Sequence, residues 1–137
     1  MIVTDAENLR DILSSSKTIA VVGLSPNPAR PSNEVARYLM ANGYTVIPVN
    51  PGQREILGQI CYPTLDAIPQ PIDIVDVFRN SVDVLPIAQA AIRIGAKCLW
   101  LQLGVIHDEA ASLASDSGLK VVINRCTKID HAWLVAP

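Results

Sequence analysis

Short apolar runs alternate with helical patterns along nearly the whole chain, and this alternation limits the folds that the chain can adopt. The runs fall at residues 18–23, 44–49, 73–78, 96–103 and 120–123. Runs of this kind are typical of strands that are buried on both faces of a parallel sheet. Between them, helical spacing of apolar residues predicts helices at about 4–16, 32–42, 80–94 and 108–117. This order of elements predicts an α/β fold with a doubly wound sheet.

The expected fold is a single Rossmann-type domain over residues 1–137, with a five-stranded parallel sheet and helices on both faces. Right-handed crossovers predict the strand order 3-2-1-4-5, in which the strand at 73–78 lies outermost. Ligands bind such sheets beyond the carboxyl ends of the strands, where the order reverses. In the predicted order, this point lies between the first and fourth strands, and the loops at 23–32 and 102–106 border it.

The charge balance argues against several classes of partner. With 11 basic and 13 acidic residues, the net charge is −2, and no basic run suggests binding to nucleic acid or to a membrane surface. No signal-like start and no apolar stretch near 18 residues are present, so we expect a soluble, cytoplasmic protein. The odd number and wide spacing of Cys61, Cys98 and Cys126 match neither a zinc site nor a disulfide framework.

The loop after the first apolar run holds groups that suit a phosphate. Gly23 permits a tight turn, and the side chains of Ser25 and Asn27 offer hydrogen bonds. Arg30 can bind a phosphate through two parallel hydrogen bonds. A helix that begins near Ser32 adds free N–H groups and the positive end of a dipole. These residues predict a phosphate site, with a solvated connecting loop as the alternative.

Two residue types that an NAD site requires are missing from the expected positions. Such a site needs a second glycine for close approach of the pyrophosphate and an acidic residue at the end of the second strand. The second strand is followed instead by Asn50-Pro51-Gly52-Gln53-Arg54, which holds no carboxylate. Arg54 suits a phosphate attached to a ribose, as in NADP or coenzyme A, although a solvated loop charge explains it equally well.

Six segments carry a resemblance to a known family. They are Val21-Val22-Gly23-Leu24-Ser25, Pro28-x-Arg30-x-Ser32, Ile47-Pro48-Val49-Asn50-Pro51, Asp76-Val77-Phe78-Arg79, Leu99-Trp100-Leu101-Gln102-Leu103-Gly104-Val105 and Arg125-Cys126-x-Lys128-x-Asp130-His131. In this order and spacing, the chain resembles the small stand-alone coenzyme A-binding domain proteins. It is similar to the N-terminal domain of the succinyl-coenzyme A synthetase alpha subunit, from Ile19 to His131.

The resemblance implies a coenzyme A site along the carboxyl edge of the sheet. By position, the residues that cradle the pyrophosphate are Gly23, Ser25, Asn27 and Arg30, with Leu24 and Ser32 as further site residues. Those that border the adenosine and its 3′-phosphate are Asn50, Pro51, Gln53 and Arg54. Those that flank the adenine or the pantetheine arm are Val77, Phe78, Arg79, Gln102, Leu103 and Gly104.

We therefore expect a protein that binds coenzyme A or an acyl derivative, as a monomer or small homo-oligomer, without catalysis of its own. In the synthetase, the phosphorylated histidine and the ligase chemistry depend on a further domain and a partner subunit, which we do not find in this sequence. Three alternatives stay open. One is an NAD(P)-binding redox or regulatory domain, one is an acyl-coenzyme A enzyme that uses Cys126 or His131, and one is an interaction domain.

Several other residues are expected to be structural. His107 is predicted to cap the helix that follows it, and Cys98 to be inert inside the fourth strand. Trp100 is expected in the core or an interface, and Trp133 and Leu134 are expected to pack back on the core. Cys61 lies on a predicted loop, where we expect it to be exposed.

Overall fold

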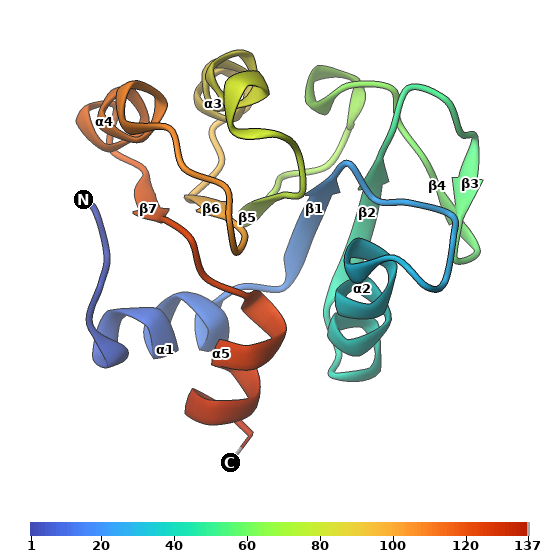
Figure 1. Ribbon diagram of the computed structural model, residues 1–137, viewed down its shortest axis with the longest axis horizontal. Helices are drawn as coiled ribbons and strands as arrows, with labels where there is room; N and C mark the ends of the chain where they lie inside the picture. Colours follow the sequence, from blue (N-terminus) through green and yellow to red (C-terminus); the bar gives the residue numbers. More distant parts are fainter. Residues whose placement is uncertain (137) are drawn as a thin grey trace.

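The computed structural model describes residues 1–136, which form a parallel sheet between two layers of helices (Figure 1). The sheet contains, in spatial order, β2 (Thr45–Val49), β1 (Thr18–Val22), β5 (Ile74–Val77), β6 (Cys98–Leu101) and β7 (Lys120–Val122). One face is covered by α3 (Val84–Arg93) and α4 (Asp108–Asp116). The other face is covered by α1 (Ala6–Ser15), α2 (Pro31–Ala41) and α5 (Thr127–Leu134). The predicted fold class is therefore confirmed.

The strands are buried on both faces, as their apolar composition predicts. Ala20 and Val22 of β1 belong to the apolar cluster under α3 and α4, whereas Ile19 and Val21 belong to the cluster on the opposite face. Trp100 is fully buried in the second cluster, and its Nε1 donates a hydrogen bond to the carbonyl of Arg125 over 2.8 Å. The indole is therefore satisfied inside the core, as expected for a buried tryptophan.

The strand at 73–78 does not take the outer position expected for it. This strand, β5, pairs in parallel with β1 on the side opposite β2. The position beyond β2 is taken instead by Tyr62, which forms an isolated parallel bridge with Val49. With Tyr62 counted as the third position and β5 as the fourth, the sheet has a Rossmann-like order. The reversal of winding therefore lies between β1 and β5.

The segment between β2 and β5 explains this difference. It contains a small antiparallel hairpin of β3 (Glu55–Ile56) and β4 (Gln59–Ile60), which the sequence analysis did not predict, and the 3₁₀ turn η1 (Leu65–Ala67). Because these residues form the hairpin, only Tyr62 is left to pair with the outer edge of β2. The next long apolar run, β5, therefore begins the second half of the sheet. It is followed by the short turn η2 (Ser81–Asp83), which leads into α3.

Several local predictions are confirmed and others are wrong. His107 caps α4, because its Nδ1 accepts a hydrogen bond from the N–H of Ala110 over 3.1 Å. Cys98 is buried, as predicted. Cys61 is only 7 % exposed, because the following Tyr62 pairs with the edge of β2 and the side chain of Cys61 joins the apolar cluster beside it. Leu134 packs on the core, but Trp133 lies on the outer side of α5 and is 78 % exposed.

The amino-terminal segment lies along the edge strand β7. Ile2 forms a parallel bridge with Val121, and the backbone N–H of Val3 donates to the carbonyl of Val121 over 2.8 Å. The edges of the sheet at β2 and β7 are thus each extended by a single bridging residue, Tyr62 at one side and Ile2 at the other. Within residues 1–136, no helix has both the length and the apolar character required to span a bilayer.

Candidate functional site

The carboxyl ends of β1 and β5 are in close contact where the winding reverses. The N–H of Phe78 donates to the carbonyl of Val22 over 2.9 Å, and Gly23 follows with a φ of +87°. A Cβ atom on Gly23 would lie 2.3 Å from the carbonyl oxygen of Phe78 and 2.9 Å from Cδ of Arg79. Only glycine fits this approach, because it combines a left-handed conformation with the absence of a side chain.

The loop after Gly23 is held by the first turn of α2. This helix begins at Pro31, one residue before the expected start, because proline suits the first helical position. The hydroxyl of Ser32 accepts a hydrogen bond from the N–H of Ser25 over 3.0 Å, and Nδ2 of Asn33 donates to the carbonyl of Ser25 over 2.9 Å. The buried side chains of Ser32 and Asn33 therefore fix the path of the loop above the sheet.

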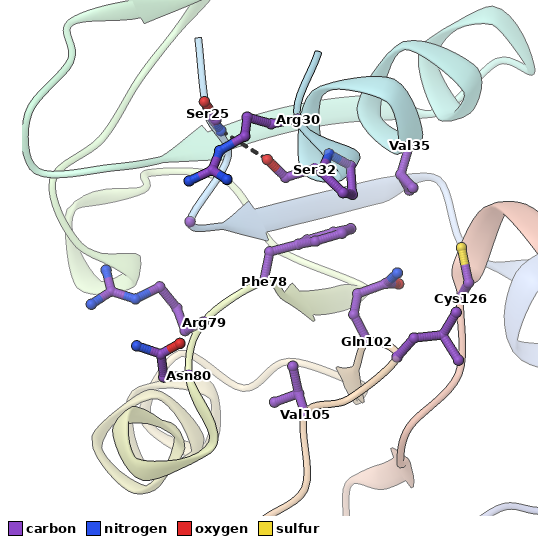
Figure 2. Close-up of a pocket in the computed structure, with 13 residues that line it drawn as sticks. Ser25, Arg30, Ser32, Val35, Phe78, Arg79, Asn80, Gln102, Val105 and Cys126 are labelled. Atoms are coloured by element: carbon purple, nitrogen blue, oxygen red, sulfur yellow. Dashed lines mark hydrogen bonds between the residues drawn. The ribbon is translucent and has the colours of Figure 1, made fainter. Parts of the chain in front are cut away.

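A cavity of about 670 Å³ lies between this loop and the ends of β5 and β6 (Figure 2). Its lining residues are Gly23, Ser25, Arg30, Pro31, Ser32, Val35, Phe78, Arg79, Asn80, Gln102, Leu103, Val105 and Cys126. Figure 2 shows Arg30 and Arg79 at one side and Gln102 and Cys126 at the other. Among these residues the cavity has two arginines and no carboxylate, so it combines a cationic side with a largely apolar remainder.

A second cavity of about 330 Å³ adjoins the first and shares Arg79 with it. It lies beyond the ends of β1 and β2 and is lined partly by Val22, Val49 and Pro51. Arg79 forms an ion pair with Asp83 at 3.6 Å, and both side chains are well exposed. An exposed pair of this kind is weak, so Arg79 remains available to a ligand.

Eight predicted site residues line the first cavity, and Pro51 lines only the second. The eight are Gly23, Ser25, Arg30, Ser32, Phe78, Arg79, Gln102 and Leu103. The predicted residues outside both cavities are Leu24, Asn27, Asn50, Gln53, Arg54, Val77 and Gly104. Leu24 and Val77 are fully buried in the core, and Gln53 and Arg54 are exposed.

Three of the outlying polar or glycine positions have structural roles that account for them. The side-chain oxygen of Asn27 accepts a hydrogen bond from the N–H of Ala29 over 3.0 Å. Asn50 donates through Nδ2 to the carbonyl of Leu24 over 3.0 Å and so ties the β2 loop to the β1 loop. Gly104 adopts a φ of +82° in the turn after β6. These residues therefore shape the loops rather than line the cavity.

A buried hydrogen-bonded network lies beneath Gln102. The N–H of Thr127 donates to Oε1 of Gln102 over 3.1 Å, which identifies that atom as an acceptor. The hydroxyl of Thr127 lies 3.2 Å from the same Oε1 and 2.9 Å from Oδ2 of Asp76. Because a hydroxyl has one proton, a neutral Asp76 completes the network by donating to Thr127, which donates to Gln102.

Burial also favours the neutral form of Asp76. The residue is fully buried in β5, and this burial raises the pKa of its carboxyl group to about 8. Its Oδ1 has no hydrogen-bond partner within residues 1–136, a further cost of ionisation at this position. The network thus holds the amide of Gln102, which is 4 % exposed, against the cavity.

The structure does not bring Cys126 and His131 together as a nucleophile and a base. Nδ1 of His131 lies 2.8 Å from the hydroxyl of Tyr38, and the ring also contacts Tyr44 edge-on. Asp130 forms a bidentate pair with Arg125, with both distances at 2.7 Å. Of the paired residues expected from the enzyme alternative, only Cys126 lines the cavity.

Acidification is expected to weaken the fold through His131. Burial lowers the pKa of this histidine, so the unfolded chain binds a proton more readily than the folded chain. The stabilisation is complete above the unfolded pKa of about 6.5 and is lost as the pH falls through the lower folded pKa. Urea unfolding of the native chain and of His131→Gln at about pH 7 and pH 5 isolates this contribution, because both proteins share all other titrating groups. The stability advantage of the native chain over the variant should shrink as the pH falls, and a difference that stays constant would contradict the contribution.

Some lining residues were missed because the sequence analysis assigned them no part in the coenzyme A site. Cys126 comes from the loop after β7, which was not expected to border the ligand, and Val105 lies in the loop after β6, close to the predicted Gln102 and Leu103. The available signal was positional, since all carboxyl ends of a parallel sheet lie at one edge. Val35 was predicted only as part of the apolar face of a helix, yet it lies at the top of the cavity in Figure 2.

Comparisons with known proteins show which family and which solved structures this chain is similar to. The family model described as CoA binding domain matches residues 17–132. The uncharacterized protein YneT of Bacillus subtilis (strain 168) is 40 % identical over 124 residues, which cover 90 % of this chain and 92 % of that protein. A hypothetical protein from Pyrococcus horikoshii OT3 has a solved structure with a TM-score of 0.94 and 41 % identity, covering 96 % of this chain and 93 % of that chain.

A larger protein is similar in sequence to part of this chain. An acetate–CoA ligase (ADP-forming) of Archaeoglobus fulgidus is 41 % identical over 58 residues, which are 42 % of this chain and 8 % of the ligase. The match to the family model extends over most of the sequence, from before β1 to the last turns of α5. The chain belongs to the CoA binding domain family.

Proposed function

We propose that this protein binds coenzyme A or an acyl-coenzyme A in the cavity between the ends of β1, β5 and β6, without catalysis of its own. The observation that carries the proposal is the lining of that cavity, in which two arginines face a mainly apolar remainder and no carboxylate is present. Its volume of about 670 Å³ falls in the usual range for small-molecule sites. Membership of the CoA binding domain family supports the same ligand.

In this proposal, the pyrophosphate binds between Arg30 and Arg79. Both guanidinium groups border the cavity, and Arg30 directly precedes α2, whose positive dipole end favours an anion. Gly23 lines the same cavity and, with a φ of +87°, turns the chain there toward the loop that carries Arg30. Charge-assisted hydrogen bonds to phosphate oxygens then supply a large part of the affinity.

The pantetheine arm extends along the apolar part of the cavity. Phe78, Val35 and Val105 supply contacts for its methyl and methylene groups. The adenosine occupies the second cavity beside Pro51, with Arg79 between the two parts of the ligand. Arg54 lies outside both cavities, so the proposal assigns it no phosphate contact.

Arg79→Ala is expected to weaken binding of coenzyme A by about 1.5–3 kcal/mol, because the variant loses a charge-assisted hydrogen bond. Arg54→Ala is the matched control, since it removes an exposed arginine that lines neither cavity and should leave the affinity unchanged. Isothermal titration calorimetry with coenzyme A measures both values. Equal losses in the two variants would indicate general charge attraction instead of a built site.

The same instrument separates the proposal from the NAD(P) alternative. Coenzyme A, dephospho-coenzyme A and NADH are titrated side by side into the native chain. Binding of coenzyme A without NADH is the expected result. Binding of NADH without coenzyme A would favour a redox or regulatory domain, and silence with all three ligands would contradict ligand binding at this cavity.

A further inference from the structure

Cys126 lies at the end of the cavity that is distant from the arginines. Its side chain lines the cavity, and in Figure 2 the sulfur points from the start of α5 toward Val35. The residue is 8 % exposed, so the thiol is reached through the cavity rather than from the open surface. Leu103, which is 58 % exposed, lines the same cavity and marks its opening to solvent.

The other two cysteines have different surroundings. Cys98 lies inside β6, and burial raises the pKa of its thiol, which keeps the sulfur protonated. Cys61 donates through Sγ to the carbonyl of Asn50 at 3.5 Å, and burial raises the pKa of this thiol as well. Neither residue lines the cavity that contains Cys126.

Gln102 places an oriented hydrogen-bond donor at the same end of the cavity. Its Oε1 is occupied by the N–H and hydroxyl of Thr127, so the orientation of the amide is determined. The remaining Nε2 donates no hydrogen bond to any residue in the range 1–136, although the side chain is almost fully buried and lines the cavity. Because this Nε2 is not sealed in the core but lies at the cavity wall, it is free to donate to an acceptor of a bound ligand.

The three chemical groups follow one another in an order that matches one ligand. From left to right in Figure 2, the cavity presents the arginines, then the amide of Gln102, then the thiol of Cys126. Coenzyme A carries its pyrophosphate at one end of the arm and its thiol at the other, with an amide carbonyl a few bonds before the thiol. Resting on the proposed binding of coenzyme A, we infer that Cys126 is a thiol–disulfide exchange site at which the protein holds coenzyme A as a mixed disulfide.

The reaction requires a disulfide of coenzyme A as the oxidised partner. The thiolate of Cys126 attacks the sulfur of the bound half, a new S–S bond forms, and the original S–S bond breaks. The second half leaves as a thiolate, which takes up the proton that Cys126 released. No net oxidation occurs, because one disulfide is exchanged for another, and free thiols reverse the step.

The inference is tested by intact-mass spectrometry of the native chain after incubation with coenzyme A disulfide. The expected product is one coenzyme A added per chain, located on the peptide that contains Cys126 by digestion without reductant, and removed by dithiothreitol. Cys61→Ser should form the adduct at the native rate, whereas Cys126→Ser should form none. Glutathione disulfide should react at least about tenfold more slowly, because it has no pyrophosphate to bind between Arg30 and Arg79.

Separate measurements distinguish a failure of the exchange reaction from a failure of coenzyme A binding. Calorimetry of the native chain with reduced coenzyme A, in the presence of reductant, tests the binding alone. Binding of reduced coenzyme A without adduct formation would overturn the exchange site and leave the proposed function standing. An adduct on Cys61 or Cys98, or equal rates with glutathione disulfide, would likewise overturn it, since the reaction would then not depend on the cavity.

Discussion

Replacing Gly23 by alanine should lower the free energy of unfolding by about 2–5 kcal/mol. The left-handed conformation of this residue, with a φ of +87°, costs a non-glycine residue about 1–2 kcal/mol. The added Cβ would also lie 2.3 Å from the carbonyl oxygen of Phe78, and the strands must separate to relieve that contact. Overpacking of this kind typically costs about 1–3 kcal/mol. Urea denaturation of the two proteins measures the difference.

Gly118→Ala is the matched control for this prediction. Gly118 has a φ of +96°, but a Cβ there would meet no atom within 4 Å. Only the conformational cost of about 1–2 kcal/mol should therefore appear. Equal losses in both variants would mean that the contact between the β1 and β5 loops relaxes freely, and Gly23 would then have no special part in their approach.

The native chain should lose stability as the pH rises from about 5 to 9, and Asp76→Asn should remove this loss. Burial raises the pKa of Asp76 to about 8, so the folded chain keeps a proton that the unfolded chain releases near its ordinary pKa of 3.8. The stabilisation is complete below the unfolded value and is lost as the pH rises through the folded value. The slope reaches about 1.4 kcal/mol per pH unit. Asparagine keeps a donor toward Thr127 without ionising.

Asp73→Asn supplies the opposite control in the same urea experiments. Although burial acts to raise it, hydrogen bonds from the N–H groups of Lys17 and Thr18 lower the pKa of Asp73. This carboxylate stabilises the fold above its unfolded pKa, and the effect is lost as the pH falls. Asp73→Asn should therefore be destabilising at neutral pH. A steeper loss at high pH in Asp76→Asn than in the native chain would contradict a neutral Asp76.

The fold could be predicted because burial on both faces leaves a strong imprint on a strand. The run of Ile19, Ala20, Val21 and Val22 has no polar residue, and all four side chains are buried in the sheet. The strand order was harder to predict. It depends on whether the chain between β2 and β5 forms a full strand or a hairpin, and that choice is made by weak pairings such as the bridge between Tyr62 and Val49. Patterns of apolar residues do not encode such pairings.

The cationic side of the candidate site was predicted better than the opposite side. Arg30 and Arg79 directly follow strand ends or precede a helix, so their positions along the chain place them at the ligand edge. Asn27 has the same polar character, but its side chain closes a local turn and does not line the cavity. Position along the sequence locates a residue at an edge, whereas the competition between local and ligand hydrogen bonds decides where its side chain points.

The single bridging residues at the two margins of the sheet bear on how the molecule behaves in concentrated solution. A long unpaired strand margin is a template on which another chain can add a strand and begin aggregation. Here Ile2 occupies part of the margin of β7 and Tyr62 occupies part of the margin of β2. Few adjacent backbone groups therefore remain open to a second molecule. Deleting residues 1–3 should expose the margin of β7 and promote association in light scattering.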